Sequence, residues 1–323
     1  MRHQRRMRRR KTGRIMTAVA AIVAVAAVAV AGVLHDRSAD PARALPIHLP
    51  ATPLSYLGVY ANSAPVSYAG LTAFTNTTGV EPDVVMYYSG WFQSFPNGFA
   101  STAARNGAVP LVQIDPTDVN VAKIASGQYD GYLSSYAVAL RSYRHPVILS
   151  FGHEMNGTWY SWGHGHTPPA TFVAAWRHIV SLFRALGARN VTWLWTVNII
   201  NDTQHGSIPS PGPWWPGSSY VNWVGIDGYY LKSSWQFAPL FGPTIGAVRK
   251  LTSDPILIAE TAAGPAAGQP AKITDLFAGI RAYGLLGFVW FDAADTQDFR
   301  VSSPAAIAAF RKGANTTYKR PAS

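Results

Sequence analysis

The chain has 323 residues, contains no cysteine and carries a formal charge of +11 at pH 7. Eight basic residues within positions 2–14 supply +8 of this charge, which leaves only +3 for residues 15–323. The charge therefore gives no reason to expect a nucleic-acid-binding protein. A chain of this length can also bury enough apolar surface to fold without disulfide bonds.

An uncharged segment rich in alanine and valine follows the basic residues, at positions 15–34. A helix of that length can cross a hydrocarbon core of about 30 Å. We predict that residues 1–34 are a signal peptide or an N-terminal membrane anchor, and we favour cleavage slightly. Because basic residues stay on the cytoplasmic side, the rest of the chain is expected outside the cytoplasm, either secreted or anchored. A Pro/Ala-rich segment at 35–53 is predicted to be a linker.

Strand-like and helix-like segments alternate beyond the linker. The predicted strands cover residues 54–61, 83–90, 109–115, 147–154, 191–198, 223–230, 255–261 and 285–292. Helix-compatible stretches cover residues 119–143, 168–186, 237–251, 272–283 and 303–313. This alternation predicts a single (β/α)8 TIM barrel at 54–314, followed by a tail at 315–323. The alternative is a doubly wound open sheet, which is disfavoured because no glycine-rich phosphate loop follows the first strand.

Two of the three glutamates in the chain, Glu154 and Glu260, end apolar runs that are predicted to be strands four and seven. In a (β/α)8 barrel the catalytic groups stand at the carboxyl ends of the strands, and strands four and seven lie across the mouth from one another. Two carboxyl groups in such a position can flank one glycosidic bond. A separation of about 5 to 5.5 Å favours retention of anomeric configuration, and about 6.5 to 9.5 Å favours inversion.

The segment HEMNGTWYSWG at 153–163 resembles the acid/base signature of glycoside hydrolase family 26, and the segments at 224–229 and 289–291 support the resemblance. That family contains β-mannanases, mixed-linkage β-glucanases and β-1,3-xylanases. The resemblance implies a TIM barrel in which Glu154 is the general acid/base and Glu260 is the nucleophile of a retaining hydrolase.

The same resemblance implies that His153 holds substrate hydroxyls and that Tyr229 holds the nucleophile, with Trp159 and Trp290 as apolar walls of the cleft. A hydrogen bond from Tyr229 is expected to favour the charged form of Glu260.

Two further residues are predicted to line the site. Trp162 falls in the loop after a predicted strand, where an exposed ring can stack on a sugar. Asp227 precedes Tyr229 by two positions on a predicted strand, so both side chains are expected to point to the same side. Residues of lower priority as subsite candidates are Asp115, Asn198, Asp202 and His205.

No metal or cofactor is predicted. The pair His153 and Glu154 lacks the second histidine four positions after the first that a zinc protease helix needs, because Gly157 stands there. Ser150 and the run at 113–116 (QIDP) stand where many mannanases of the family carry an arginine and a histidine, so the choice of sugar stays open at this stage.

The sequence thus predicts an exported, monomeric, retaining endo-glycosidase that cleaves a neutral β-linked polysaccharide, with β-1,4-mannan or glucomannan as the expected substrate. Within the family, the alternatives are a β-1,3-1,4-glucanase (lichenase) and a β-1,3-xylanase. Outside it, the alternatives are a non-catalytic polysaccharide-binding barrel and a membrane-anchored accessory to polysaccharide synthesis. Nucleic acid is not an expected partner.

Overall fold

The computed structural model describes residues 49–200 and 208–318. Eight parallel strands in sequence order close into a barrel, so the predicted (β/α)8 fold is confirmed. The strands are β1 (Tyr56–Tyr60), β2 (Val84–Gly90), β3 (Val109–Asp115), β4 (Val147–Phe151), β5 (Val191–Asn198), β6 (Trp223–Asp227), β7 (Ile256–Thr261) and β8 (Gly287–Phe291).

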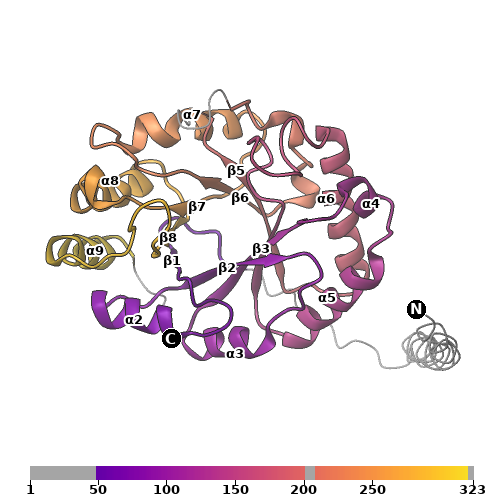
Figure 1. The fold of residues 1–323 in the computed structure, drawn as a ribbon, viewed down its shortest axis with the longest axis horizontal. Coiled ribbons are helices and arrows are strands. Elements are labelled where there is room, and N and C mark those ends of the chain that lie inside the picture. Colours follow the sequence, from indigo (N-terminus) through magenta and orange to yellow (C-terminus); the bar gives the residue numbers. More distant parts are fainter. Residues whose placement is uncertain (1–48, 201–207, 319–323) are drawn as a thin grey trace, which may run out of the picture. The chain divides into compact units, whose positions relative to one another are not determined.

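The helices form a ring outside the strands (Figure 1). They are α2 (Ala69–Thr78), α3 (Asn97–Arg105), α4 (Val121–Ala125), α5 (Asp130–Tyr143), α6 (Pro169–Ala185), α7 (Phe237–Arg249), α8 (Gln269–Ala282) and α9 (Pro304–Thr317). Short 3-10 turns at Gly212–Trp214, Ser218–Tyr220 and Pro265–Ala267 lie in the loops.

Several helix boundaries differ from those predicted. The stretch at 119–143 is two helices rather than one, because a turn containing Gly127 in the left-handed region (φ +80°) separates α4 from α5. Helix α9 continues to Thr317, so residues 315–317 belong to the last helix rather than to a tail.

Apolar side chains fill two separate layers. The inner layer lies inside the barrel and includes Met86, Leu111, Ile148, Leu194 and Leu257. The outer layer lies between the strands and the helices. Strand β4 is buried along its whole length, as expected for a parallel strand that is covered on both faces.

Within the described ranges, no helix combines the length and the apolar character that crossing a membrane requires. The predicted signal or anchor at 1–34 and positions 35–48 of the predicted linker lie outside those ranges.

Candidate active site

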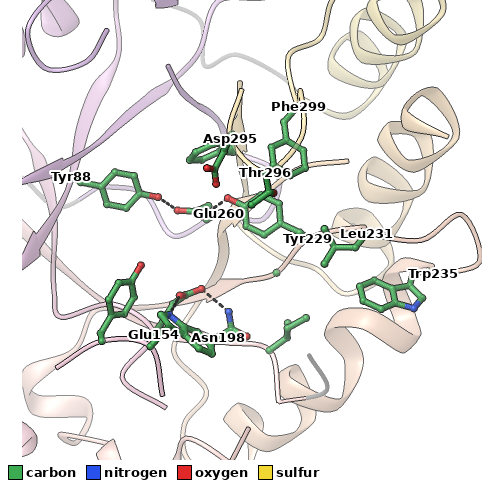
Figure 2. Close-up of a pocket in the computed structure, with 15 residues that line it drawn as sticks. Tyr88, Glu154, Asn198, Tyr229, Leu231, Trp235, Glu260, Asp295, Thr296 and Phe299 are labelled. Carbon is green, nitrogen blue, oxygen red and sulfur yellow. Dashed lines mark hydrogen bonds between the residues drawn. The ribbon is translucent and has the colours of Figure 1, made fainter. Parts of the chain in front are cut away.

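A cavity of about 460 Å³ opens at the carboxyl ends of the strands, and Glu154 and Glu260 both line it (Figure 2). The volume is in the range of small-molecule binding sites. The lining residues are Tyr88, Glu154, Trp159, Tyr160, Asn198, Ile199, Gly228, Tyr229, Leu231, Trp235, Glu260, Phe291, Asp295, Thr296 and Phe299.

Glu154 lies in a turn rather than on a strand. Strand β4 ends at Phe151, three residues earlier than predicted, and Gly152 and Glu154 then adopt left-handed backbone angles (φ +56° and +54°). The backbone N–H of Glu154 donates to the carbonyl of Thr196 on β5, which fixes the turn against the barrel. A residue other than glycine rarely adopts such an angle, and such strain is concentrated at functional sites.

Two donors hold the carboxylate of Glu154. Trp159 Nε1 donates to Oε2 at 2.8 Å, and Asn198 Nδ2 donates to Oε1 at 2.6 Å (Figure 2 shows the latter). Asn198 is itself fixed, because its backbone N–H donates to Asn156 Oδ1 and its carbonyl accepts from Asn156 Nδ2, both at 2.9 Å. Asn156, in the segment at 153–163, therefore positions Glu154 indirectly.

Glu260 reaches the cavity because β7 contains a β-bulge. The register pairs Ile258 with Phe288 and then Thr261 with Trp290, so two residues of β7 oppose one residue of β8. Ala259 belongs to the inner core of the barrel, and Glu260, the next residue, lines the cavity above it. A regular strand would alternate faces and turn Glu260 toward the helices.

The carboxylate of Glu260 accepts hydrogen bonds from two tyrosines, with Tyr88 at Oε2 and Tyr229 at Oε1 (Figure 2). The hydrogen bond from Tyr229 was predicted. The location of Tyr229 on a strand was wrong, because β6 ends at Asp227 and Tyr229 lies in the loop that follows. Tyr88 comes from β2 and was not predicted.

Burial raises the pKa of Glu260 to about 8, and the negative charge of Asp295 acts in the same direction. The hydrogen bond that was expected to favour the charged form is present, but the net shift of the pKa is toward the neutral form. The hydroxyls of Tyr88 and Tyr229 donate to the carboxylate, which opposes the increase in pKa. Burial and the charge of Asp295 outweigh these two donors.

His153 does not line the cavity, contrary to the prediction that it contacts the substrate. It is buried, with Nδ1 2.8 Å from Asp115 Oδ1 and Nε2 3.1 Å from the Tyr160 hydroxyl. Burial lowers the pKa of His153, but the neighbouring Asp115, with smaller effects from Glu154 and Asp227, outweighs it and raises the pKa to about 9. His153 supports Tyr160, which does line the cavity.

Asp227 also lies behind the cavity rather than in it. Its side chain is completely buried, and neither carboxyl oxygen has a hydrogen-bond partner among the described residues. Burial raises the pKa of Asp227 well above its ordinary range, and the negative charge of Glu154 adds to this effect, whereas His153 opposes it. The prediction that Asp227 contacts the substrate is therefore wrong in this structure.

Two predicted tryptophans are buried packing residues. Trp162 stacks on Tyr160 at 4.3 Å and donates to the carbonyl of His153 at 2.8 Å. Trp290 is fully buried and donates to the carbonyl of Phe299 at 3.1 Å. Alternation along β8 turns Trp290 toward the helices, and its neighbour Phe291 faces the cavity instead.

Several cavity residues escaped the sequence analysis, notably Tyr88, Trp235, Asp295, Phe291 and Phe299. Phe291 and Tyr88 could have been found by extending strand alternation to the ends of β8 and β2. Trp235, Asp295 and Phe299 lie in loops, where no periodic pattern shows which way a side chain points. Asn198, a subsite candidate, does line the cavity. Asp115, another candidate, does not line it and is instead hydrogen-bonded to His153.

The candidates Asp202 and His205 lie outside the described residues. Within the ranges that are described, no group of three or more histidine, aspartate or glutamate side chains is arranged to hold a metal ion.

Comparison with known proteins agrees with this architecture. The family model described as glycosyl hydrolase family 26 matches residues 114–283, and the chain belongs to that family. Endoglucanase H of Acetivibrio thermocellus is 32% identical over 270 residues, covering 78% of this chain and 30% of that protein. Beta-1,3-xylanase TXYA of a Vibrio species is 31% identical over 134 residues, covering 38% of this chain and 27% of that protein. The chain thus spans less than a third of the length of these curated relatives.

Solved structures share the fold. The Bacillus subtilis mannanase man26 aligns with a TM-score of 0.61 and 16% identity, over 83% of this chain and 86% of that one. The β-mannanase BoMan26A of Bacteroides ovatus aligns with a TM-score of 0.61 and 14% identity, over 81% of this chain and 89% of that one. At these identities the likeness establishes the barrel and leaves the substrate open.

Proposed function

We propose that this member of the family is a retaining endo-glycosidase that cleaves a neutral β-linked polysaccharide, with Glu154 as general acid/base and Glu260 as nucleophile. The observation that carries the proposal is that these two carboxyl groups, from turns and strands on opposite sides of the barrel, line one cavity and have different hydrogen-bond partners.

The proposed reaction has two steps. Glu154 donates its proton to the glycosidic oxygen while a Glu260 oxygen attacks the anomeric carbon, so the bond to the leaving sugar breaks and a glycosyl ester forms on Glu260. Glu154 then removes a proton from water, the hydroxyl adds to the anomeric carbon, and the ester bond to Glu260 breaks. Two inversions give net retention, and both carboxyl groups return to their starting forms.

The tyrosines around Glu260 have a defined part in this scheme. Tyr88 and Tyr229 donate to the oxygens of Glu260, which stabilises the ionised form that attacks and the carboxylate that leaves. Trp159 and Asn198 each donate a hydrogen bond to one oxygen of Glu154, which fixes the orientation of its carboxyl group.

The lining supports a neutral sugar chain. Among the described residues of the cavity there is no lysine or arginine to pair with an anionic sugar, and Asp295 adds a third carboxyl group beside the pair. The rings of Trp159, Trp235, Phe291 and Phe299 offer apolar surfaces for the C–H faces of pyranoses. We propose β-1,4-mannan or glucomannan as the substrate, as the sequence led us to expect.

A mixed-linkage β-glucan is the second candidate. It is favoured by the relative named Endoglucanase H, whose similarity to this chain covers more residues than that of the relatives named as xylanases. Two relatives are named as β-1,3-xylanases, so β-1,3-xylan is included among the substrates tested.

The test combines substrate range with stereochemistry. The purified protein is incubated with mannan, glucomannan, lichenan and β-1,3-xylan, and reducing ends are measured. The anomer that forms first on the best substrate is then identified by proton NMR before mutarotation. Early appearance of the β anomer supports the proposal. The α anomer would contradict the retaining route, and no release from any of the four glycans would favour a binding role instead.

We also propose that the protein acts outside the cytoplasm, because the basic start and the apolar segment at 15–34 match an export signal or anchor. N-terminal sequencing of the protein recovered from culture medium and from membranes tests this. A start beyond residue 34 in the medium indicates cleavage, and an intact start in the membrane fraction indicates anchoring.

A further inference from the structure

An aromatic residue on the rim of the barrel mouth is exposed to an unusual degree. Phe92, in the loop that joins β2 to α3, has 61% of its surface exposed, more than any other aromatic residue in the described parts of the chain. Strand β2 ends at Gly90, so this loop lies at the same end of the barrel as the cavity.

The backbone at Phe92 is held in the left-handed region, with φ +68°. A bulky side chain is rare there, because the Cβ approaches the backbone closely. Hydrogen bonds on both sides of Phe92 maintain the conformation. Gln93 N donates to the carbonyl of Gly90 at 3.2 Å, Gly90 N donates to Gln93 Oε1 at 3.1 Å, and the Tyr132 hydroxyl donates to the carbonyl of Gln93 at 3.1 Å.

Neighbouring rings support Phe92 from its sides. Tyr129 and Tyr132, from the start of α5, lie 5.7 Å and 5.5 Å from it in edge-to-face geometry, and Trp91 lies 6.4 Å away in the same geometry. None of these described rings stacks in parallel on Phe92. The rim patch, defined as Phe92, Tyr129 and Tyr132, is thus a partly exposed aromatic surface held by edge-to-face ring contacts and by the hydrogen bond from Tyr132.

The rim patch is connected to the cavity through two strands. Tyr88, which contacts Glu260, precedes Phe92 by four positions, and four residues span at most about 14 Å. Trp91 packs at 6.1 Å from Phe151, the last residue of β4, just before the turn that carries Glu154. The rim patch therefore lies close to a residue that lines the cavity, at the same end of the barrel.

We propose that the rim patch is a distal binding site for the same neutral β-linked polysaccharide, in which Phe92 stacks on the apolar face of a pyranose outside the cavity. This inference rests on the proposed function for its ligand. Stacking on a ring that is already held in place costs little side-chain entropy. The contact does not need a charged group on the ligand, so the patch suits an uncharged, extended sugar chain.

The test uses Phe92→Gly, because glycine adopts φ +68° without strain and the variant is expected to fold as well as the parent. Tyr283→Ala is the control, since it removes another exposed aromatic ring after α8, at the opposite end of the barrel. Each variant is assayed on the preferred polymer and on a short aryl β-disaccharide of the same sugar.

We expect Phe92→Gly to lower kcat/KM on the polymer by about 2- to 12-fold, the range that one aromatic contact supplies. The rate on the aryl disaccharide should stay unchanged, and Tyr283→Ala should change neither. An equal loss on both substrates, or no loss on the polymer, would overturn the distal site.

A binding measurement separates this inference from the hydrolase proposal. In a Glu154→Gln background, native gels containing the soluble polysaccharide should retard the protein, and adding Phe92→Gly should weaken the retardation. If the parent protein releases no reducing ends from any of the four polysaccharides, the hydrolase proposal fails, while the gels still decide whether Phe92 binds the glycan. Equal retardation with and without Phe92 would exclude its role.

Discussion

Asp295 and Glu260 line the same cavity, and the negative charge of Asp295 adds to the effect of burial on the pKa of Glu260. Figure 2 shows the Asp295 side chain above Glu260, on the loop after β8. Tyr60 and Tyr229 also lie near Glu260, and burial raises the pKa of each phenol, so both stay neutral in the range where the carboxyl group titrates. Asp295 is therefore the charged neighbour whose removal should change the titration of Glu260.

Asp295→Asn should shift the rising limb of the pH profile of kcat/KM to lower pH. The nucleophile must be ionised to attack, and loss of the nearby charge lets Glu260 ionise at lower pH. Asp298→Asn is the control, because that aspartate sits in the same loop but pairs with Arg300. Profiles that coincide with the parent, or that shift equally in both variants, would show that Asp295 does not act on Glu260.

Glu154→Gln and Glu260→Gln should each lower kcat by at least about a thousandfold, because each removes a group that exchanges a proton or forms a bond in the proposed steps. The third glutamate provides a matched control. Glu81→Gln changes an exposed side chain at the amino end of β2, on the other side of the barrel, and should leave kcat within about twofold. Unchanged circular dichroism and melting temperature verify the fold. Substantial activity in either site variant would refute its assigned role.

Glu260→Gln should also change how stability depends on pH. The carboxyl group titrates near 8 in the folded protein and near 4.5 when unperturbed, so between these values the folded state holds a proton that the unfolded state has lost. The parent protein is consequently destabilised as pH rises from 4.5 to 8, and glutamine removes that loss.

The melting temperature of Glu260→Gln minus that of the parent should therefore increase between pH 4.5 and pH 8 and level off above it. We expect a rise of at least about 3 °C, which corresponds to roughly 1 kcal/mol for a domain of this size. Thermal unfolding followed by circular dichroism at four pH values measures it. A difference that does not vary with pH would mean that Glu260 titrates normally.

Phe291 and Trp290 are adjacent on β8, and we expect Phe291→Ala to reduce activity and Trp290→Phe to reduce stability. Phe291→Ala removes a cavity wall and should lower kcat/KM by about tenfold or more. Trp290→Phe breaks a buried hydrogen bond and leaves space in the outer core, so it should lower stability by about 1 to 3 kcal/mol and change kcat/KM little. Urea unfolding and initial rates on the same two preparations test the pair. The reverse pattern would place Trp290 in the cavity.

The barrel was predictable because a parallel strand buried on both faces leaves a continuous apolar run, as at Val147–Phe151. The two glutamates were identifiable for a related reason. Placing a carboxyl group beside a buried apolar strand costs free energy, so its presence there indicates a function. Helices α2 and α3 were not located from the sequence, because each is short and buries only three residues.

The surroundings of the glutamates were less predictable. The turn after β4 places Tyr160 between His153 and the cavity, and no spacing rule states that one side chain will cover another. Alternation gives the side of the strand on which Asp227 lies but not its depth, and the residue is completely buried and does not line the cavity. The sequence did not predict that the pKa of Glu260 is raised, because it could not show the burial of this carboxyl group or the position of Asp295. Together these two effects outweigh the tyrosine donors.

The bulge in β7 has a consequence for comparing or redesigning barrels of this kind. Ala259 and Glu260 together face a single position of β8. The direction of the glutamate side chain therefore depends on the bulge in the backbone as well as on the residue type. Grafting a glutamate at the matching position of a regularly paired strand would leave its carboxyl group on the helix side. A transplant has to carry the extra residue with it, along with Gly225 next to Ala259, where an added Cβ would come within 2.9 Å of the alanine.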